Sequence, residues 1–289
     1  MSGEAPGLPG DVVYLKLPRP AELFEGRARR LREVAPGNPM GDFLEALAAV
    51  ADAQSRLVGR VPPAPVGTEV ATSVPLRATT WTRHAAWREV LAGLVEELLG
   101  REWPAPASQA LRLLASAGPE KLETMADGVL RGTPASTDLA AAPFVGAALQ
   151  VYFAALAAGL PAARLERSQR GCPVCASPPV AGVVLGDDKL RYLCCSLCGS
   201  EWNLTRIQCW NCRNTGGIRF LEVAGDQGGL KAEACAACGA YLKLFYRDRM
   251  PSVEPMADDV ASLTLDLLAA QDGWARSGVN LFLLGGGEG

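Results

Sequence analysis

The chain has 289 residues, of which 49% are hydrophobic and 20% charged, and its 28 Lys and Arg nearly balance its 31 Asp and Glu. It is long enough for one large or two ordinary domains and too apolar to be wholly disordered. Neither the part before Gln169 nor the part after it has a positive excess, so we expect no nucleic acid partner.

The first ten residues, Met1–Gly10, lack a basic region followed by an apolar one, so the sequence predicts no secretory signal and a cytoplasmic location. An extended segment is expected at Val12–Leu17, followed by an arginine-rich amphipathic helix at Glu22–Val34. Asn38 fits the N-cap of a second helix, because apolar side chains recur at helical spacing from Phe43 to Leu57.

A proline-rich loop at Val61–Pro75 separates these helices from three more, expected at Trp87–Leu98, Ala107–Ala117 and Pro119–Arg131. The single histidine, His84, lies in the helical pattern before Trp87, which indicates a helix-surface or interface residue and not a metal ligand. With no second histidine, the sequence also disfavours histidine-dependent catalysis.

One apolar segment resembles a membrane span. Leu139–Leu160 runs for 22 residues without a charge, which is long enough to cross a bilayer. It is mostly alanine, however, and Pro143, Gly146 and Gln150 interrupt it. We therefore expect a buried central helix and no membrane insertion.

The pattern changes after Gly171 to short alternating runs separated by glycine and cysteine turns. Hairpin strands are predicted at Val180–Leu185, Lys189–Leu193, Ile218–Val223 and Tyr241–Tyr246. An amphipathic helix at Ala257–Ala275 and a glycine-rich tail follow.

Eight of the nine cysteines form four C-x-x-C knuckles. In chain order these are Cys172 and Cys175, Cys195 and Cys198, Cys209 and Cys212, and Cys235 and Cys238. A two-residue spacing lets a tight turn present both sulfurs to one ion, and paired cysteines in a reducing compartment more often bind metal than form disulfides. The four knuckles therefore predict two four-cysteine sites for two metal ions, iron or zinc.

The gaps between knuckles favour pairing the first with the second and the third with the fourth. These gaps hold 19 and 22 residues, close to zinc-ribbon spacing, whereas the middle gap holds 10. Interleaved pairing, first with third and second with fourth, stays open. The expected fold class is α+β, with a helical domain at 1–168, rubredoxin-like or zinc-ribbon-like metal modules at 169–206 and 207–250, and a C-terminal helix and tail at 251–289.

The favoured role of the metal is structural, because a module this short buries too little apolar surface to fold alone. Electron transfer through iron and dithiol exchange are the alternatives. The ninth cysteine, Cys194, precedes a knuckle in an extended segment, so its side chain should point away from the metal as a non-ligand.

Together these motifs closely resemble the FdhE family of formate dehydrogenase accessory proteins. The resemblance rests on CPVCASPPV, LRYLCCSLCGSEWN, CWNC, KAEACAACGAYLKLFY and ADDVASLTLDLLAAQDGWARSGVN, with weaker similarity in GNPMGDFLEALAAVADAQ and APFVGAALQVYFAALA. It implies a cytoplasmic protein with rubredoxin-type sites, formed by the eight knuckle cysteines, that binds the catalytic molybdenum subunit before that enzyme becomes active. Two positions depart from the family pattern: Cys194 replaces a usual histidine, and Leu281 replaces the proline of an Asn-Pro-Phe tail.

The leading hypothesis is thus a non-enzymatic assembly factor with no nucleophile, base and orienter set. Candidate contact faces are the arginine-rich Glu22–Arg32 and the acidic Glu254–Asp259, although for each segment alone a solvated helix face is the favoured interpretation. The alternatives are a rubredoxin-like electron-transfer or sulfur-delivery protein acting on the molybdenum enzyme and, less favoured, a nucleic-acid-binding zinc ribbon. Self-association is a further option that the sequence leaves open.

Overall fold

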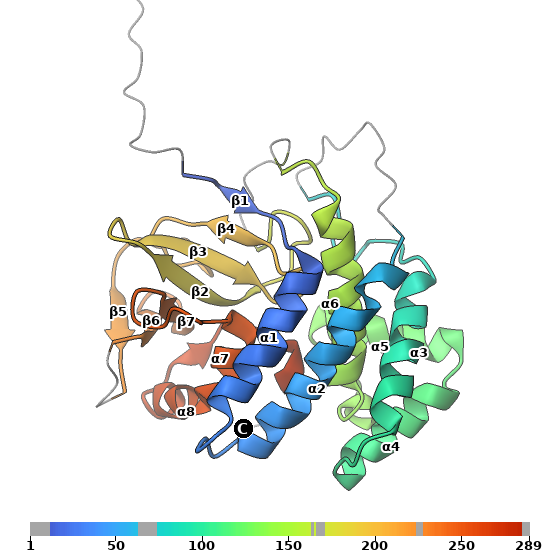
Figure 1. Ribbon diagram of the computed structural model, residues 1–289. Helices are drawn as coiled ribbons and strands as arrows, with labels where there is room; N and C mark the ends of the chain where they lie inside the picture. Colours follow the sequence, from blue (N-terminus) through green and yellow to red (C-terminus); the bar gives the residue numbers. More distant parts are fainter. Residues whose placement is uncertain (1–11, 63–73, 163–164, 166–170, 224–227, 285–289) are drawn as a thin grey trace, which may run out of the picture.

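The computed structural model describes residues 12–62, 74–162, 165, 171–223 and 228–284, which form a helical layer packed beside one twisted sheet (Figure 1). The helices of the first part are α1 (Pro20–Val34), α2 (Gly41–Leu57), α3 (Ala86–Leu99), α4 (Ala105–Ser116), α5 (Pro119–Arg131) and α6 (Ala142–Ala158). The expected helical N-terminal region and mixed α+β class are confirmed. The expected loop at Val61–Pro75 lies largely outside the described residues.

Helix α6 is the centre of the helical layer. It lies among α2, α3 and α5, and its side chains are buried along almost its whole length. This burial explains the apolar run at Leu139–Leu160, because a helix surrounded by others has no solvent face to make polar. Within the described part of the chain, every helix is too short or too polar to cross a bilayer.

Two expected helix starts shift by a few residues. Helix α2 begins at Gly41, and Asn38 lies one turn earlier, where its Oδ1 accepts from the Met40 backbone N–H at 2.9 Å. His84 lies just before α3 with an exposed side chain, and its Nδ1 accepts from the Ala86 N–H at 3.2 Å. His84 therefore satisfies a free donor at the start of the helix, as N-terminal capping residues do.

The strands form one sheet of eight. They are β1 (Leu15–Lys16), β2 (Pro179–Leu185), β3 (Leu190–Cys195), β4 (Glu201–Asn203), β5 (Ile218–Leu221), β6 (Leu230–Cys235), β7 (Ala240–Tyr246) and β8 (Ala275–Arg276). Their order is β1-β4-β3-β2-β7-β6-β5, with β8 added to β7. The sequence patterns predicted β2, β3, β5 and β7, and missed β4, β6 and β8.

The two cysteine-rich regions share this sheet because β2 and β7 pair in parallel, from Gly182 with Leu244 to Val184 with Tyr246. Gly182 permits the close approach: a Cβ there would lie 2.5 Å from the Leu244 Cδ2 atom. The regions expected as tandem modules are therefore one continuous structure, with antiparallel hairpins on either side of a parallel junction (Figure 1).

The expectation of a single C-terminal helix at Ala257–Ala275 is wrong. The structure has α7 (Pro255–Ala261) and α8 (Leu263–Gln271), broken at Ser262. The buried Lys243 ammonium lies at the break and donates to the Asp259 and Ser262 carbonyls at 2.9 and 3.1 Å. Together with the Asp259 and Asp266 carboxylates, with which Lys243 forms salt bridges, these carbonyls satisfy a buried cation that would otherwise cost several kcal/mol.

The two candidate contact faces contact each other within the chain. Arg27 of α1 donates to Glu254 at 3.1 Å, and Arg30 donates to Asp258 of α7 at 2.7 Å. Both carboxylates are buried. The expectation that these segments face a partner is therefore wrong for these four side chains, which join the helical layer to the C-terminal part.

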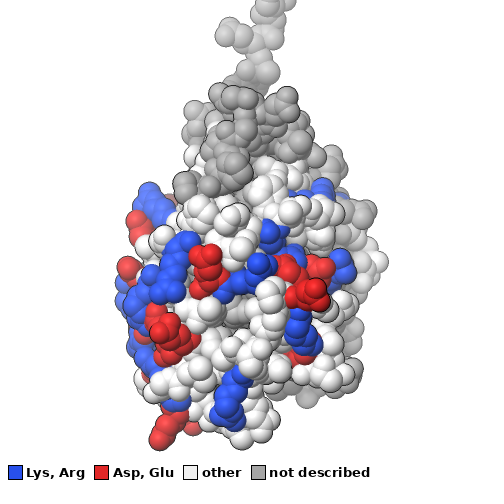
Figure 2. All heavy atoms as spheres, turned by 90° about the vertical axis from the view of Figure 1, so that its right-hand side faces the viewer, with Lys and Arg blue, Asp and Glu red and all other residues white. Residues whose placement is uncertain are grey.

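The C-terminal segment around Asn280 is also internal. Asn280 is buried and its side chain bonds the Met256 carbonyl and Asp259, while Leu281 packs against Gly146 of α6. The face of the molecule beside α3 to α5 shows Lys and Arg interspersed with Asp and Glu (Figure 2). That face has no single-sign patch of the kind that neutralises phosphates.

Candidate metal centres

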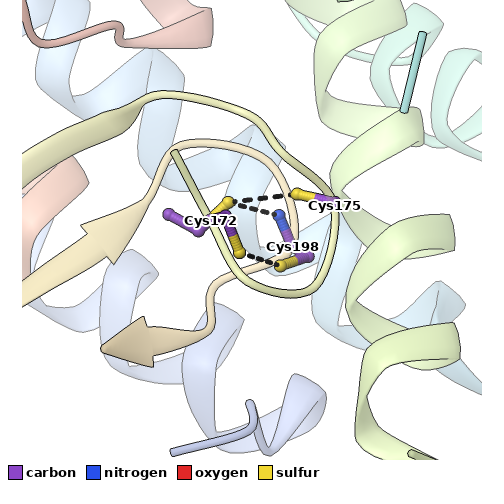
Figure 3. Close-up of side chains that lie close together, drawn as sticks. Cys172, Cys175 and Cys198 are labelled. Atoms are coloured by element: carbon purple, nitrogen blue, oxygen red, sulfur yellow. Dashed lines mark hydrogen bonds between the residues drawn. The ribbon is translucent and has the colours of Figure 1, made fainter. Parts of the chain in front are cut away.

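The four knuckles gather into two clusters of four sulfurs. Cys172, Cys175, Cys195 and Cys198 form the first cluster, and Cys209, Cys212, Cys235 and Cys238 form the second; in each, the sulfurs lie within 4.8 Å of one another. The structure thus pairs the first knuckle with the second and the third with the fourth, and the interleaved arrangement is not formed. Figure 3 shows the first cluster, with sulfurs from two loops turned toward one point.

The sulfur separations fit a tetrahedral ion. They are 3.6 Å for Cys172 to Cys198 and 3.4 Å for Cys175 to Cys195. In the second cluster they are 3.8 Å for Cys209 to Cys238 and 3.6 Å for Cys212 to Cys235. An ion bound by four thiolates at about 2.3 Å needs sulfurs about 3.8 Å apart, so both clusters have the size that zinc or iron requires.

Each knuckle reverses direction through a residue in the left-handed conformation directly after its second cysteine. These residues are Ala176, Gly199, Arg213 and Gly239, with φ between 63° and 72°. The turn closes when its backbone bonds back to the first cysteine, as from Ala176 N–H to Cys172 O and from Gly239 N–H to Cys235 O, both at 2.9 Å. The local geometry that brings two sulfurs together is therefore set by hydrogen bonds within about six residues.

Backbone N–H groups also point at the sulfurs. In the first cluster the Val174 N–H lies 3.4 Å from Cys172 Sγ, and the Leu197 N–H lies 3.4 Å from Cys195 Sγ. In the second cluster, burial by itself raises the pKa of Cys235. Hydrogen bonds from the Cys238 and Ala237 backbone and from neighbouring thiols outweigh this effect and lower the pKa to about 7. Such donors stabilise thiolates, the form that binds metal.

One thiol in each cluster shows the opposite effect, a raised pKa in the absence of a cation. Burial and the neighbouring thiols raise the pKa of Cys172 well above the usual thiol value, and burial raises that of Cys209 to about 12. Four sulfurs this close cannot all ionise in a buried site unless a cation offsets their charge. The chemistry of the donor set therefore fits a metal ion.

The two clusters differ in exposure. All four cysteines of the first cluster are buried and belong to the main hydrophobic core, which continues into the helical layer. In the second cluster Cys212 and Cys238 are exposed. A metal in the first cluster would therefore brace the core, whereas a metal in the second would lie at the surface.

Comparison with known proteins identifies the family. Sequence models of the FdhE N-terminal, central and C-terminal domains match residues 12–170, 171–206 and 207–283. The chain belongs to the FdhE family. Its relatives include "Protein FdhE homolog" of Cronobacter sakazakii, 38% identical, and "Protein FdhE" of Escherichia coli O1:K1, 37% identical, each alignment covering 95% of this chain and 92% of the relative.

A solved structure agrees with this assignment. The crystal structure of the FdhE protein from Pseudomonas aeruginosa superposes with a TM-score of 0.86 at 34% identity, over 96% of this chain and 100% of that one. The family expected from the cysteine motifs, that of formate dehydrogenase accessory proteins, is therefore confirmed over nearly the whole chain.

Cys194 belongs to neither cluster. It lies on β3, paired with Ala181 and Glu201, and is buried among core side chains. Burial raises its pKa well above the usual thiol value. Cys194 is therefore a neutral core residue here, as the alternation of strand side chains predicted.

The sequence patterns did not predict a buried ion pair beside the segment that enters the second cluster. Arg191 of β3 pairs with Glu233 of β6, and its Nη2 donates to the Thr205 and Gln208 carbonyls at 2.6 Å each. Burial lowers the pKa of Arg191 and raises that of Glu233. The segment that Arg191 holds leads directly into Cys209. The only sequence signal was a charge within an otherwise apolar strand pattern.

Substitution of a glycine beside the first knuckle tests the backbone geometry of that turn. Gly171 has a φ of 69°, and an added Cβ would lie 2.5 Å from the Ala176 carbonyl oxygen. We expect Gly171→Ala to lower the free energy of unfolding by about 2–4 kcal/mol, from left-handed strain plus a backbone clash. Urea unfolding of the metal-loaded protein measures this.

The matched control is Gly239→Ala in the fourth knuckle. Gly239 has a φ of 68° with open space around the added Cβ. It should cost about 1 kcal/mol, the strain alone. Equal losses in the two variants would contradict the close backbone approach at Gly171.

Proposed function

We propose that this chain is a cytoplasmic, non-enzymatic accessory factor that binds the catalytic molybdenum subunit of a formate dehydrogenase and supports its maturation. The observation that carries the proposal is membership of the FdhE family across the N-terminal, central and C-terminal regions. Similarity over the full length favours a shared role, since a common cysteine module alone would cover less than half of the chain.

The eight knuckle cysteines would hold two metal ions, iron or zinc, one in each cluster. Because β2 and β7 join the two clusters into one sheet, and α1 joins α7 through buried ion pairs, the described helical and sheet regions are linked into one packed structure. A rigid surface suits an assembly factor, because little conformational entropy is lost when it binds a partner.

Co-purification tests the proposal. The affinity-tagged chain is expressed in anaerobic cells of a strain that lacks its own FdhE, together with the untagged catalytic subunit. We expect that subunit to co-purify with the chain, and formate dehydrogenase activity to depend on the chain. If the subunit does not co-purify with the chain and formate dehydrogenase activity does not depend on the chain, the proposal is wrong.

A second candidate is electron transfer or sulfur delivery to the molybdenum enzyme, favoured by the exposure of Cys212 and Cys238. Iron bound there would lie at the protein surface, where a docked partner can exchange one electron with it. Protein purified without oxygen should then contain iron and show a reversible visible spectrum. Two zinc ions and no iron would exclude the electron-transfer role.

A further inference from the structure

A large groove lies in the helical layer where α2, α4 and α6 begin. Its walls are the first half of α2, the segment from Arg101 to Ala107 that enters α4, and the start of α6, and Phe282 contributes to the floor. Its volume is about 1200 Å³. Small-molecule pockets usually measure 300–1,000 Å³, so this groove has room for several side chains of a polypeptide.

The groove wall is fixed by its own contacts. Trp103 donates from Nε1 to the Leu98 carbonyl at 2.7 Å and packs edge-on against Phe144, with ring centroids 5.9 Å apart. Pro104, at the N-cap of α4, and Pro143, in the first turn of α6, restrict the backbone on either side. The groove is therefore preformed, and a ligand would not have to order it.

The lining is mainly apolar, yet part of it contacts solvent. Phe43, Ala46, Trp103, Ala107 and Pro143 are half-buried and line the groove. Exposed apolar surface gathered in one concave region is uncommon in monomeric proteins and marks sites that bind another apolar group. Covering it would recover about 25 cal/mol for each Å² removed from water.

The charges around the groove are mostly negative. Asp42 and Glu45 are exposed, three residues apart on α2, and Glu102 is exposed on the opposite wall, against one basic residue, Arg101. Among the described residues, none of these three carboxylates forms a salt bridge. Their negative potential is thus available to a ligand, apart from the electrostatic influence of Glu45 on Arg32.

We propose that this groove binds an apolar segment of another protein that carries arginine or lysine at one end. The apolar side chains would fill the space between α2 and Trp103, as anchors one helical turn apart do in grooves of this kind. The basic end would lie against Asp42, Glu45 and Glu102. This inference is independent of which protein supplies the segment, so it does not require the proposed function to hold.

Fluorescence anisotropy tests the proposal with the metal-loaded full chain. The probe is a fluorescein-labelled peptide of about 15 residues, leucine and alanine in a helical pattern with two arginines at one end. A second peptide has two glutamates in place of the arginines. We expect saturable binding of the arginine peptide, at least about threefold to tenfold tighter than that of the glutamate peptide.

Variants assign the binding to the groove. Ala46→Trp should fill the groove and weaken binding of the arginine peptide at least about tenfold. Ala107→Trp fills the groove from the other wall and serves as the test if the first variant does not fold. Asp42→Asn with Glu45→Gln should remove the preference for arginine. The matched control is Glu89→Gln with Glu96→Gln on α3, where both carboxylates are also exposed and Glu89 likewise lies in a first helical turn.

Three results would overturn the proposal. One is the absence of saturable binding, and another is unchanged binding in both tryptophan variants. The third is a dimer in sedimentation that Ala46→Trp dissociates, because a second copy of this chain would then occupy the groove.

Discussion

Replacing Cys195 with serine is expected to abolish the cooperative thermal unfolding of the native protein. Cys195 is fully enclosed in the first cluster, which lies in the main core between β3 and the helical layer. A structural metal contributes on the order of 10 kcal/mol, as much as the whole stability of an ordinary domain. Losing it would also leave three buried thiols without a cation.

Metal analysis with near-ultraviolet circular dichroism measures this effect. Cys195→Ser should lose the metal of the first cluster and most of the signal from fixed aromatic packing. Cys194→Ser is the matched control, because the adjacent thiol belongs to neither cluster and should keep both metal ions. A Cys195→Ser protein with two metal ions and an unchanged melting temperature would falsify the assignment of the first cluster.

The same change in the second cluster should have a smaller effect. Cys212 is exposed, and the second cluster lies at the surface. Cys212→Ser should therefore lose one metal ion while the helical layer and the first cluster stay folded. If both serine variants unfold alike, the difference in burial has no energetic consequence.

Replacing Arg191 with methionine is expected to lower the free energy of unfolding by about 3–5 kcal/mol, because the Glu233 carboxylate would then be buried without its partner. The Thr205 and Gln208 carbonyls would lose their donor as well. Because this segment leads into Cys209, metal affinity of the second cluster should fall more than that of the first.

Urea unfolding and metal titration of three variants separate these contributions. Arg191→Met with Glu233→Leu removes both charges and should recover much of the lost stability, since a buried pair is often replaceable by apolar groups. The control Arg219→Met lies on β5, exposed and without a salt bridge among the described residues, and should change stability by less than about 0.5 kcal/mol. Full stability in Arg191→Met alone would contradict a structural role for the pair.

Local sequence patterns, the spacing of apolar residues and the residues at helix ends, predicted most of the helical layer. The stripe from Phe43 to Leu57 matches α2, and Pro119–Arg131 matches α5 at both ends, where a proline and a left-handed glycine mark the limits. The strands β4 and β6 were missed because one has three residues and the other carries lysine and glutamate, which conceals its alternation.

The C-terminal helix was misjudged for a different reason. The amphipathic pattern continues through Ser262, and nothing in the local sequence announces a break. The break coincides with carbonyls that bind Lys243 of β7, and that lysine is 16 and 19 residues away in sequence. A tertiary contact overrode the local preference for one continuous helix.

The sequence by itself determined which cysteines share a knuckle. A two-residue spacing brings both sulfurs of a knuckle to one side of a turn, so each half-site follows from local chain geometry. The gap lengths between knuckles favoured one pairing of the knuckles, and the structure decided it. Histidine is dispensable because sulfur supplies all eight expected ligands.

Only the tertiary structure decided how the clusters differ. The parallel pairing of β2 with β7 unites them in one sheet, and the contact with α1 and α6 buries the first while the second stays at the surface. Arg27 and Arg30 of α1 likewise pair with carboxylates that are 227 and 228 residues away in the sequence. Such contacts depend on which surfaces meet once the whole chain has folded, and no local pattern of residues specifies that.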